Sequence, residues 1–429
     1  MRTALAPRDE TPAAAARLVE RHSPGLNWWP TLFGLAVIAG CVALDLAMLR
    51  DGLDELDEGY FIEQATRVIH GQLPYRDFEA LYTPGLLYVH AWLFDLLGGP
   101  SLVVPRLVSL VGRIILAVAI LNLTRQLVNT RWAVLPPLML LLGLDTIPGG
   151  WEPHPGWYSA AATALATLVV ASLPAVAPRR HTLWLVLAGA ATALVFLFKQ
   201  NAGVFAFAAA FNLLLVRGLD ISRPSVTRQV RVLQVATVAA TLGVALWLTR
   251  PFLGIDVAVV VLSPLLAASL PALRTATTPD GESLAQRLRP LVPFSLGFSS
   301  LTLLWLVPLF AALDLRLEPL APFIGAVDQA NLYFPLELPS PEFWFARPTT
   351  ELPITSLLLA PERFGAGLAV LLPVLGAWAG AWIVSKTPPG RAEWRLQWLL
   401  FAGALAFLTE YPRMDIYHLA WSAPILLVV

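Results

Sequence analysis

Apolar and polar positions alternate along this 429-residue chain in long blocks, and the apolar blocks reach the length of membrane-spanning helices. A helix needs about 20 mainly apolar residues to cross the hydrocarbon core of a bilayer. Runs of roughly this length, some of them shorter, begin near Leu32, Ser101, Trp132, Tyr158, Thr182, Ala202, Val232, Val257, Leu291, Phe364, Leu396 and Leu419. The pattern predicts an all-α, polytopic membrane protein with roughly 12 transmembrane helices.

Composition agrees with lipid as the main solvent of the chain. Apolar residues make up 57% of the sequence, charged residues only 14%, and the mean hydropathy is +0.67. A water-soluble domain could not cover so much apolar surface with so few charges. The formal net charge is zero, which gives no reason to expect nucleic acid as a partner, and the single cysteine excludes an intrachain disulfide framework.

The basic residues predict the orientation of the chain in the membrane. They gather in every second connection, at 125–131, 179–180, 217–231, 274–289 and 386–395. Basic connections face the cytoplasm, so we expect a multi-pass protein of the cell inner (plasma) membrane with a cytoplasmic N-terminus. The opposite, extracytoplasmic connections then hold nearly all the acidic residues.

A single membrane domain is expected. Residues 1–30 are interpreted as a cytoplasmic tail and 31–429 as one transmembrane domain with outer loops at 50–99 and 314–363. The chain ends inside an apolar run, so its C-terminus is expected to be truncated. We interpret 82–97 as an interfacial or half-inserted helix, because a further crossing there would reverse the orientation of everything that follows.

The first outer loop contains an amphipathic pattern. Phe61, Ala65, Val68 and Ile69 recur at helical spacing, which predicts a surface helix with Asp57–Glu58 at its start. A carboxylate at the membrane boundary could act as a general base, and Asp57 is the candidate. An aspartate before a helix is also a common N-cap, and that alternative stays open.

Two other acidic residues of this loop have simpler interpretations. Glu58 would by default be a solvated acid in the first turn, favoured there by the helix dipole. Asp77 follows Pro74 and Arg76, which is typical of a turn with a local Arg–Asp pair, with a role at the acceptor as the alternative.

Cations also occur on the predicted outer side. Lys199 lies in a short break between two apolar runs, where it could bind a phosphate or extend to the interface. Arg413, Asp415 and His418 lie within six residues. Arg413 and His418 could bind the same phosphate, or Arg413 could form a structural pair with Asp415.

The second outer loop supplies Glu152 and His154 among prolines and tryptophans as candidates for a second acidic or acceptor site. Metal-ligand spacing is missing from these scattered residues, so no metal site is predicted, although a divalent cation is compatible with them. The sequence contains neither G-x-x-x-x-G-K-[ST] nor G-x-G-x-x-G, so a nucleotide bound by a phosphate loop is not supported.

Four motifs follow the first span in the order DEGYF, GQLPYRDF, YTPGLLYVHAWLF and PRLVSLVGR. With these motifs the chain resembles the bacterial branch of the C-type membrane glycosyltransferases, the protein-mannosyltransferase and aminoarabinose-transferase group. The KQNAG segment at Lys199 also resembles that group. The resemblance implies acceptor activation by Asp57–Glu58, a second outer-loop acid near Glu152, and inversion at the sugar carbon. The chain departs from the family where Tyr82–Thr83 precede the proline, since relatives often carry a basic residue or histidine there.

The residues and the resemblance together predict an enzyme of the bacterial cell envelope. It would move a sugar from a polyprenyl-phosphate donor to an extracytoplasmic lipid, glycan or protein acceptor. Asp57 would act as base, and Lys199, Arg413 and His418 would bind the donor phosphate. A multi-span transporter or lipid flippase is the main alternative. Such a protein would show repeats and broken helices with ionisable groups near the bilayer midplane. A non-catalytic membrane scaffold is a third.

Overall fold

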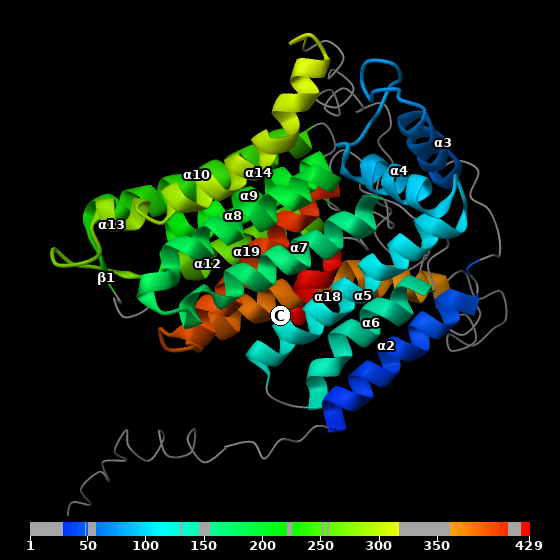
Figure 1. Cartoon of the computed structure of the whole chain (residues 1–429). Coiled ribbons are helices and arrows are strands. Elements are labelled where there is room, and N and C mark those ends of the chain that lie inside the picture. The colour runs from blue at the N-terminus through cyan, green and yellow to red at the C-terminus, as the bar shows by residue number, and fades with distance from the viewer. Residues whose placement is uncertain are drawn as a thin grey trace, which may run out of the picture.

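The computed structural model describes residues 29–47, 49, 57–128, 131–145, 155–220, 225–250, 253–254, 257–316, 361–410 and 422–429, and these form a helical bundle (Figure 1). The predicted N-terminal tail and most of the loop at 314–363 lie outside the described residues. The α-helices are α2 (Trp29–Ala47), α3 (Asp57–Ile69), α4 (Gly85–Leu97), α5 (Val103–Leu127), α6 (Leu135–Asp145), α7 (Pro155–Ser172), α8 (His181–Phe198), α9 (Gln200–Val216), α10 (Arg228–Thr249), α12 (Ser263–Ala272), α13 (Leu284–Leu288), α14 (Leu291–Ala312), α18 (Pro361–Lys386) and α19 (Arg391–Ala406).

Short elements join these helices. They are the 3-10 turns η1 (Arg131–Val134), η2 (Leu173–Ala175), η3 (Pro178–Arg180), η8 (Phe407–Glu410) and η9 (Ala423–Val428), the π-helical turn η5 (Ala258–Leu262), and the strands β1 (Ser225–Val226) and β2 (Ala276–Thr277). The two strands pair in parallel, with Ser225 opposite Ala276. The strands therefore connect the segment before α10 to the segment after α12.

Within the part of the chain that the structure describes, five helical stretches are long and apolar enough to cross a membrane. They are Val103–Leu127, Gly156–Ala175, Pro178–Phe198, Arg228–Thr249 and Leu284–Ala312. The predicted class, a helical polytopic membrane protein, therefore agrees with the structure. The described residues do not confirm the predicted count of about 12 spans, because several apolar runs form helices too short to meet the length of a span.

The centre of the bundle is held by close packing of α8, α9 and α14. Gly189 and Gly297 lie at the crossing of α8 and α14, and a Cβ on Gly189 would come within 1.9 Å of the Phe294 carbonyl oxygen. Small residues allow membrane helices to approach this closely and to gain dispersion contacts. Beside the crossing, the ring of Phe207 from α9 lies 4.5 Å from the ring of Phe298 and 5.3 Å from that of Phe294.

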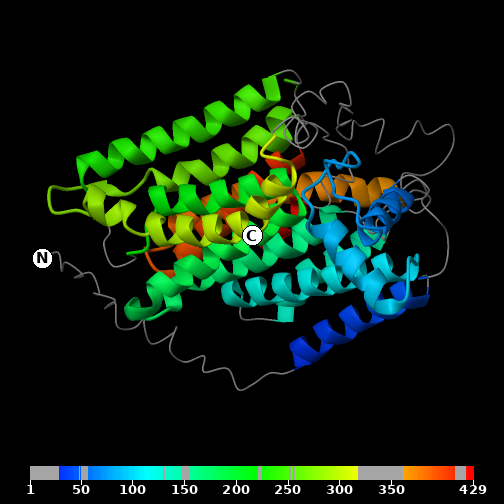
Figure 2. The same ribbon diagram turned by 45° about the horizontal axis from the view of Figure 1, so that its top comes forward.

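The two ends of the bundle differ in the elements and the charges that they contain. Helices α3 and α4 lie together at one end, and α13 with β1 lies at the opposite end, as both ribbon views show (Figures 1 and 2). We call the first the outer end and the second the inner end, because the basic connections 179–180, 217–231, 274–289 and 386–395 join the helices at the latter. By the positive-inside rule we predict that this end faces the cytoplasm.

Helix α4 covers most of the apolar segment 82–97. It has 13 residues and ends at Gly98, whose φ of 91° is a left-handed conformation that glycine adopts without strain. At 1.5 Å per residue it is about 20 Å long, shorter than the roughly 30 Å hydrocarbon core. Its Ala91 and Phe94 share an apolar cluster with Ala65 of α3. This length favours the prediction of an interfacial rather than a spanning helix.

Candidate functional site

The predicted surface helix of the first outer loop is present as α3. It begins at Asp57, and the side chains of Phe61 and Ala65 are buried, as the amphipathic pattern predicted. Glu63 and Arg67 form an exposed ion pair on the opposite face. Asp57 is the first residue of the helix, and its side chain lies outside the described part of the structure. Its role as base or cap therefore stays a prediction.

The expectation that Glu58 is a solvated acid is wrong. Its side chain is fully buried and forms a bidentate ion pair with Arg106 at the start of α5, with Oε1–Nε and Oε2–Nη2 distances of 2.6 and 2.7 Å. Arg106 also donates to the Leu49 carbonyl oxygen at 2.9 Å. This arrangement neutralises both charges and fixes the first turn of α3 against α5. A carboxylate so enclosed cannot reach an acceptor without breaking the pair.

Lys199 lies in a sharp break between α8 and α9. Its backbone is extended, with φ −151° and ψ 113°, and its amide donates to the Val195 carbonyl oxygen. Gly203 allows the turn, since a Cβ there would come within 2.2 Å of the Phe196 Cα. The lysine is only 3% exposed. Its ammonium group is therefore enclosed by protein, and the alternative of a side chain extended to the surface is not observed.

Gln200 connects this break to the first outer loop. Its Nε2 donates to the Leu81 carbonyl oxygen at 2.9 Å, and its Oε1 accepts from the Thr83 amide at 3.4 Å. The Thr83 hydroxyl is buried without a hydrogen-bond partner among the described residues. Gln200 thus holds the segment at Leu81 to Thr83 directly beside Lys199. The sequence offered only its position in the KQNAG segment as a signal.

An apolar cluster joins the same two regions. Phe61, Tyr75, Leu86 and Tyr158 are buried in it, and Phe198, the neighbour of Lys199, packs against it. Phe61 lies one turn after Asp57 in α3. The first turn of α3 and the lysine break, far apart in the sequence, are therefore held against one cluster at the outer end.

An apolar groove of about 610 Å³ lies next to this cluster. It runs between α4 and α14, and Leu197, two residues before Lys199, forms part of its wall. Aromatic residues on the wall include Tyr88, Trp92 and Trp305. The Trp305 Nε1 is buried and has no hydrogen-bond partner among the described residues. The groove could take an apolar chain and offer a polar atom at its side.

Asp77 belongs to a local turn. Its carboxylate accepts two hydrogen bonds from the Arg76 guanidinium, at 3.0 and 2.9 Å, and one from the Leu73 amide at 2.8 Å. The Arg76 hydrogen bonds, followed by the Leu73 amide, lower the pKa of Asp77 to about 2. The carboxylate stays ionised near neutral pH. The turn interpretation fits these contacts, and a pKa this low makes a weak base.

The remaining candidates fall on other parts of the chain. Glu152, His154, Arg413 and His418 lie outside the described residues, so their approach to Lys199 stays a prediction. Among the described residues, no three His, Cys, Asp or Glu side chains lie close enough to hold a metal ion.

Comparisons with known proteins give distant matches only. No family model and no curated protein matches the chain. Two solved structures of the Archaeoglobus fulgidus oligosaccharyltransferase are similar to it. The complex with Zn and sulfate has 13% sequence identity and a TM-score of 0.46, and the match covers 91% of this chain and 48% of that one. The form tethered to an acceptor peptide has 16% identity and a TM-score of 0.47, and the match covers 94% of this chain and 49% of that one. The apo form of that protein matches similarly, with 13% identity and a TM-score of 0.47. The chain spans about half the length of these proteins, and its membership of the C-type transferases stays a prediction.

Proposed function

We propose that this protein is a membrane glycosyltransferase that moves a sugar from a polyprenyl-phosphate donor to an extracytoplasmic acceptor. One observation supports this most directly. The helix that begins at Asp57 and the break that holds buried Lys199 meet at one apolar cluster, beside an apolar groove. A base, a cation and a lipid-accepting surface are the three features that this reaction requires.

In the proposed reaction the Asp57 carboxylate accepts a proton from an acceptor hydroxyl or amide. The freed electron pair attacks the anomeric carbon, and the bond from that carbon to the phosphate oxygen breaks. The polyprenyl phosphate leaves with the bonding electrons, and the sugar carbon is inverted. Lys199, together with Arg413 and His418, would stabilise the negative charge that develops on the phosphate.

The surroundings of Lys199 fit a phosphate ligand. Lys199 is only 3% exposed and lies between two apolar helices, in surroundings of low dielectric constant that strengthen its attraction for a negatively charged group. The groove wall at Leu197 begins two residues away, so a prenyl chain lying in the groove would bring its phosphate toward the lysine. Glu58 would act as a positioning residue, since its ion pair with Arg106 holds the helix start that carries Asp57.

The transporter or flippase alternative predicts a different fate for the donor. A transporter would move the polyprenyl-phosphate sugar across the bilayer unchanged, whereas a transferase consumes it. The test uses the full chain in liposomes with a panel of polyprenyl-phosphate sugars and a mixed pool of lipid, glycan and peptide acceptors. Mass spectrometry then detects both the glycosylated product and the donor on each side of the membrane.

The two lysines of the chain offer a matched pair for this assay. Lys199→Met should raise the KM for the donor at least tenfold with little change in the KM for the acceptor, because only the donor carries the phosphate. Lys386→Met removes an exposed cation at the inner end and should leave both values unchanged. Donor that crosses the membrane intact, or equal effects of Lys199→Met on both substrates, would contradict the proposal.

A further inference from the structure

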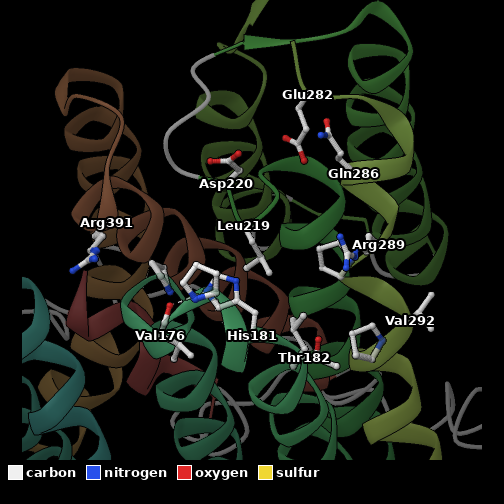
Figure 3. A pocket seen from close by; sticks show the side chains of 15 residues that line it. Val176, His181, Thr182, Leu219, Asp220, Glu282, Gln286, Arg289, Val292 and Arg391 are labelled. Atoms are coloured by element: carbon white, nitrogen blue, oxygen red, sulfur yellow. Dashed lines mark hydrogen bonds between the residues drawn. The ribbon is translucent and has the colours of Figure 1, made fainter. Parts of the chain in front are cut away.

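A second cavity lies at the inner end of the bundle, far from the proposed active site. Its volume is about 1060 Å³, and four separate stretches of the chain line it: 174–185, 219–220, 282–293 and Arg391. Figure 3 shows Arg391 and Arg289 on opposite sides of the cavity, with His181 between them. The reaction proposed above uses none of these residues.

The cavity combines cationic side chains with apolar walls. Arg289 and Arg391 are exposed cations, whereas Leu185 and Leu219 contribute apolar surface. The His181 Nε2 pairs with the Val176 carbonyl oxygen at 2.9 Å, which fixes the ring at the rim. An apolar wall below a cationic rim matches a molecule with an anionic head and a hydrocarbon body.

Two carboxylates also line the cavity, and one of them is neutralised. Glu282 accepts hydrogen bonds from Arg287 at 3.1 and 2.6 Å, and both side chains are buried. Asp220 therefore contributes the remaining acidic charge against Arg289 and Arg391. With Glu282 neutralised by Arg287, the remaining net charge of the residues that line the cavity is positive, which attracts an anion and disfavours a zwitterionic or cationic ligand.

The surrounding charge has the same sign. The described residues of the connections at this end include the cations Arg179, Arg180, Arg217, Arg228, Arg231, Arg274, Arg287, Arg289, Lys386, Arg391 and Arg395, against the carboxylates Asp220, Asp280, Glu282 and Glu393. Basic pockets between helices on the cytoplasmic side suit the headgroups of anionic lipids. The cavity is thus placed where an inner-leaflet phosphate can be reached.

We propose that this cavity binds an anionic phospholipid of the cytoplasmic leaflet. The phosphate would lie at the rim, attracted by Arg289 and Arg391 from opposite sides, and the first part of the acyl chains would lie against Leu185, Leu219 and Val292. Because the four lining stretches come from distant parts of the chain, a bound lipid would join them and stabilise the inner end by mass action.

The test compares lipids of equal acyl chains on the purified full chain. Native mass spectrometry would count phosphatidylglycerol and phosphatidylcholine adducts, and thermal unfolding would be followed with each lipid added. We expect phosphatidylglycerol to bind at least tenfold more tightly and to raise the unfolding temperature. Equal binding of the two lipids would overturn the proposal.

Variants separate this cavity from general charge at the membrane surface. Arg289→Gln with Arg391→Gln should lower phosphatidylglycerol binding about tenfold and abolish the thermal shift. The matched control, Arg228→Gln with Lys386→Gln, removes two exposed cations of the same end that do not line the cavity and should leave both unchanged. A loss of the same size in the control would show surface attraction only and would overturn the proposal.

Two further experiments test the shape of the cavity and the source of the phosphate that it binds. Thr182→Trp keeps every cation but fills an exposed position of the lining, so it should also lower lipid binding. Soluble glycerol phosphate, added as competitor, should displace the lipid only at concentrations more than a hundredfold above the lipid. Displacement at equal concentration would mean that the cavity takes a free phosphate compound and not a lipid.

Discussion

Each end of the bundle contains a buried bidentate Arg–Glu pair, but the two pairs do different things. At the outer end Glu58 and Arg106, 48 residues apart, join α3 to α5. At the inner end Glu282 and Arg287 are only five residues apart, and the Arg287 Nη1 donates to the Leu215 and Val216 carbonyl oxygens at 2.9 and 2.6 Å. The inner pair thus caps the last turn of α9.

The difference lies in what each pair holds. Several bonds reinforce the inner end: Arg217 pairs with Glu393 at 2.8 Å, and the Trp394 Nε1 donates to the Gly218 carbonyl oxygen at 2.7 Å. The outer pair positions the start of a short surface helix next to the proposed site. Similar chemistry therefore closes a helix end on one side and sets the position of the proposed catalytic segment on the other.

Breaking the two pairs should give the largest effects. Glu58→Gln and Glu282→Gln each leave an arginine buried without its charged partner, which costs about 3–5 kcal/mol. Both should lower the thermal midpoint in detergent. Only Glu58→Gln should also lower the transfer rate per folded molecule, because it releases the helix start. A similar fall in the rate of folded Glu282→Gln protein would remove the distinction between the ends.

The second-largest effects are expected from substitutions of two glutamines. Gln200 bonds the outer loop at Leu81 and Thr83, whereas buried Gln234 donates to the Val216 carbonyl oxygen at 2.6 Å at the inner end. Gln200→Leu should lower transfer about tenfold, equal to about 1.4 kcal/mol for two lost hydrogen bonds. Gln234→Leu should lower the stability of the protein without lowering its transfer rate. Rates and unfolding midpoints of both variants check this, and an unchanged rate for Gln200→Leu would contradict the positioning role.

Asp77 should give the smallest effect. Its pKa is lowered to about 2 by Arg76 and the Leu73 amide, so its contribution to the turn is complete above the unfolded pKa of about 3.9 and is lost as the pH falls toward 2. Between pH 5 and 8 the group does not titrate. Asp77→Asn should leave the transfer rate within about twofold across that range, and a loss above tenfold would return Asp77 to the site.

Much of the helical layout could be predicted from the sequence, because periodicity and apolar length are local properties. The amphipathic helix at Asp57 to Ile69 and the break at Lys199 are found where the pattern indicates them. The number of spans could not be predicted reliably, since apolar runs such as 85–97 and 200–216 form helices of 13 and 17 residues that pack within the bundle.

Side-chain environments were harder to predict because they depend on distant partners. Glu58 has the signature of a solvated helix-start acid, and only its contact with Arg106 in the tertiary structure explains its burial. The burial of Lys199 likewise depends on the packing of Phe198 against the first outer loop. A single sequence carries no direct signal for such pairings, although an arginine in the first turn of an apolar run was a hint that an acid is near.

The central claim is that the outer end carries a base at the start of α3, and one measurement addresses it directly. The transfer rate and thermal midpoint of Asp57→Asn are compared with those of Glu63→Gln, which changes an exposed acid of the same helix. The proposed reaction predicts that Asp57→Asn lowers the rate at least about a hundredfold with an unchanged midpoint, while Glu63→Gln stays near the unmodified protein. Near-normal transfer by folded Asp57→Asn protein would contradict the claim.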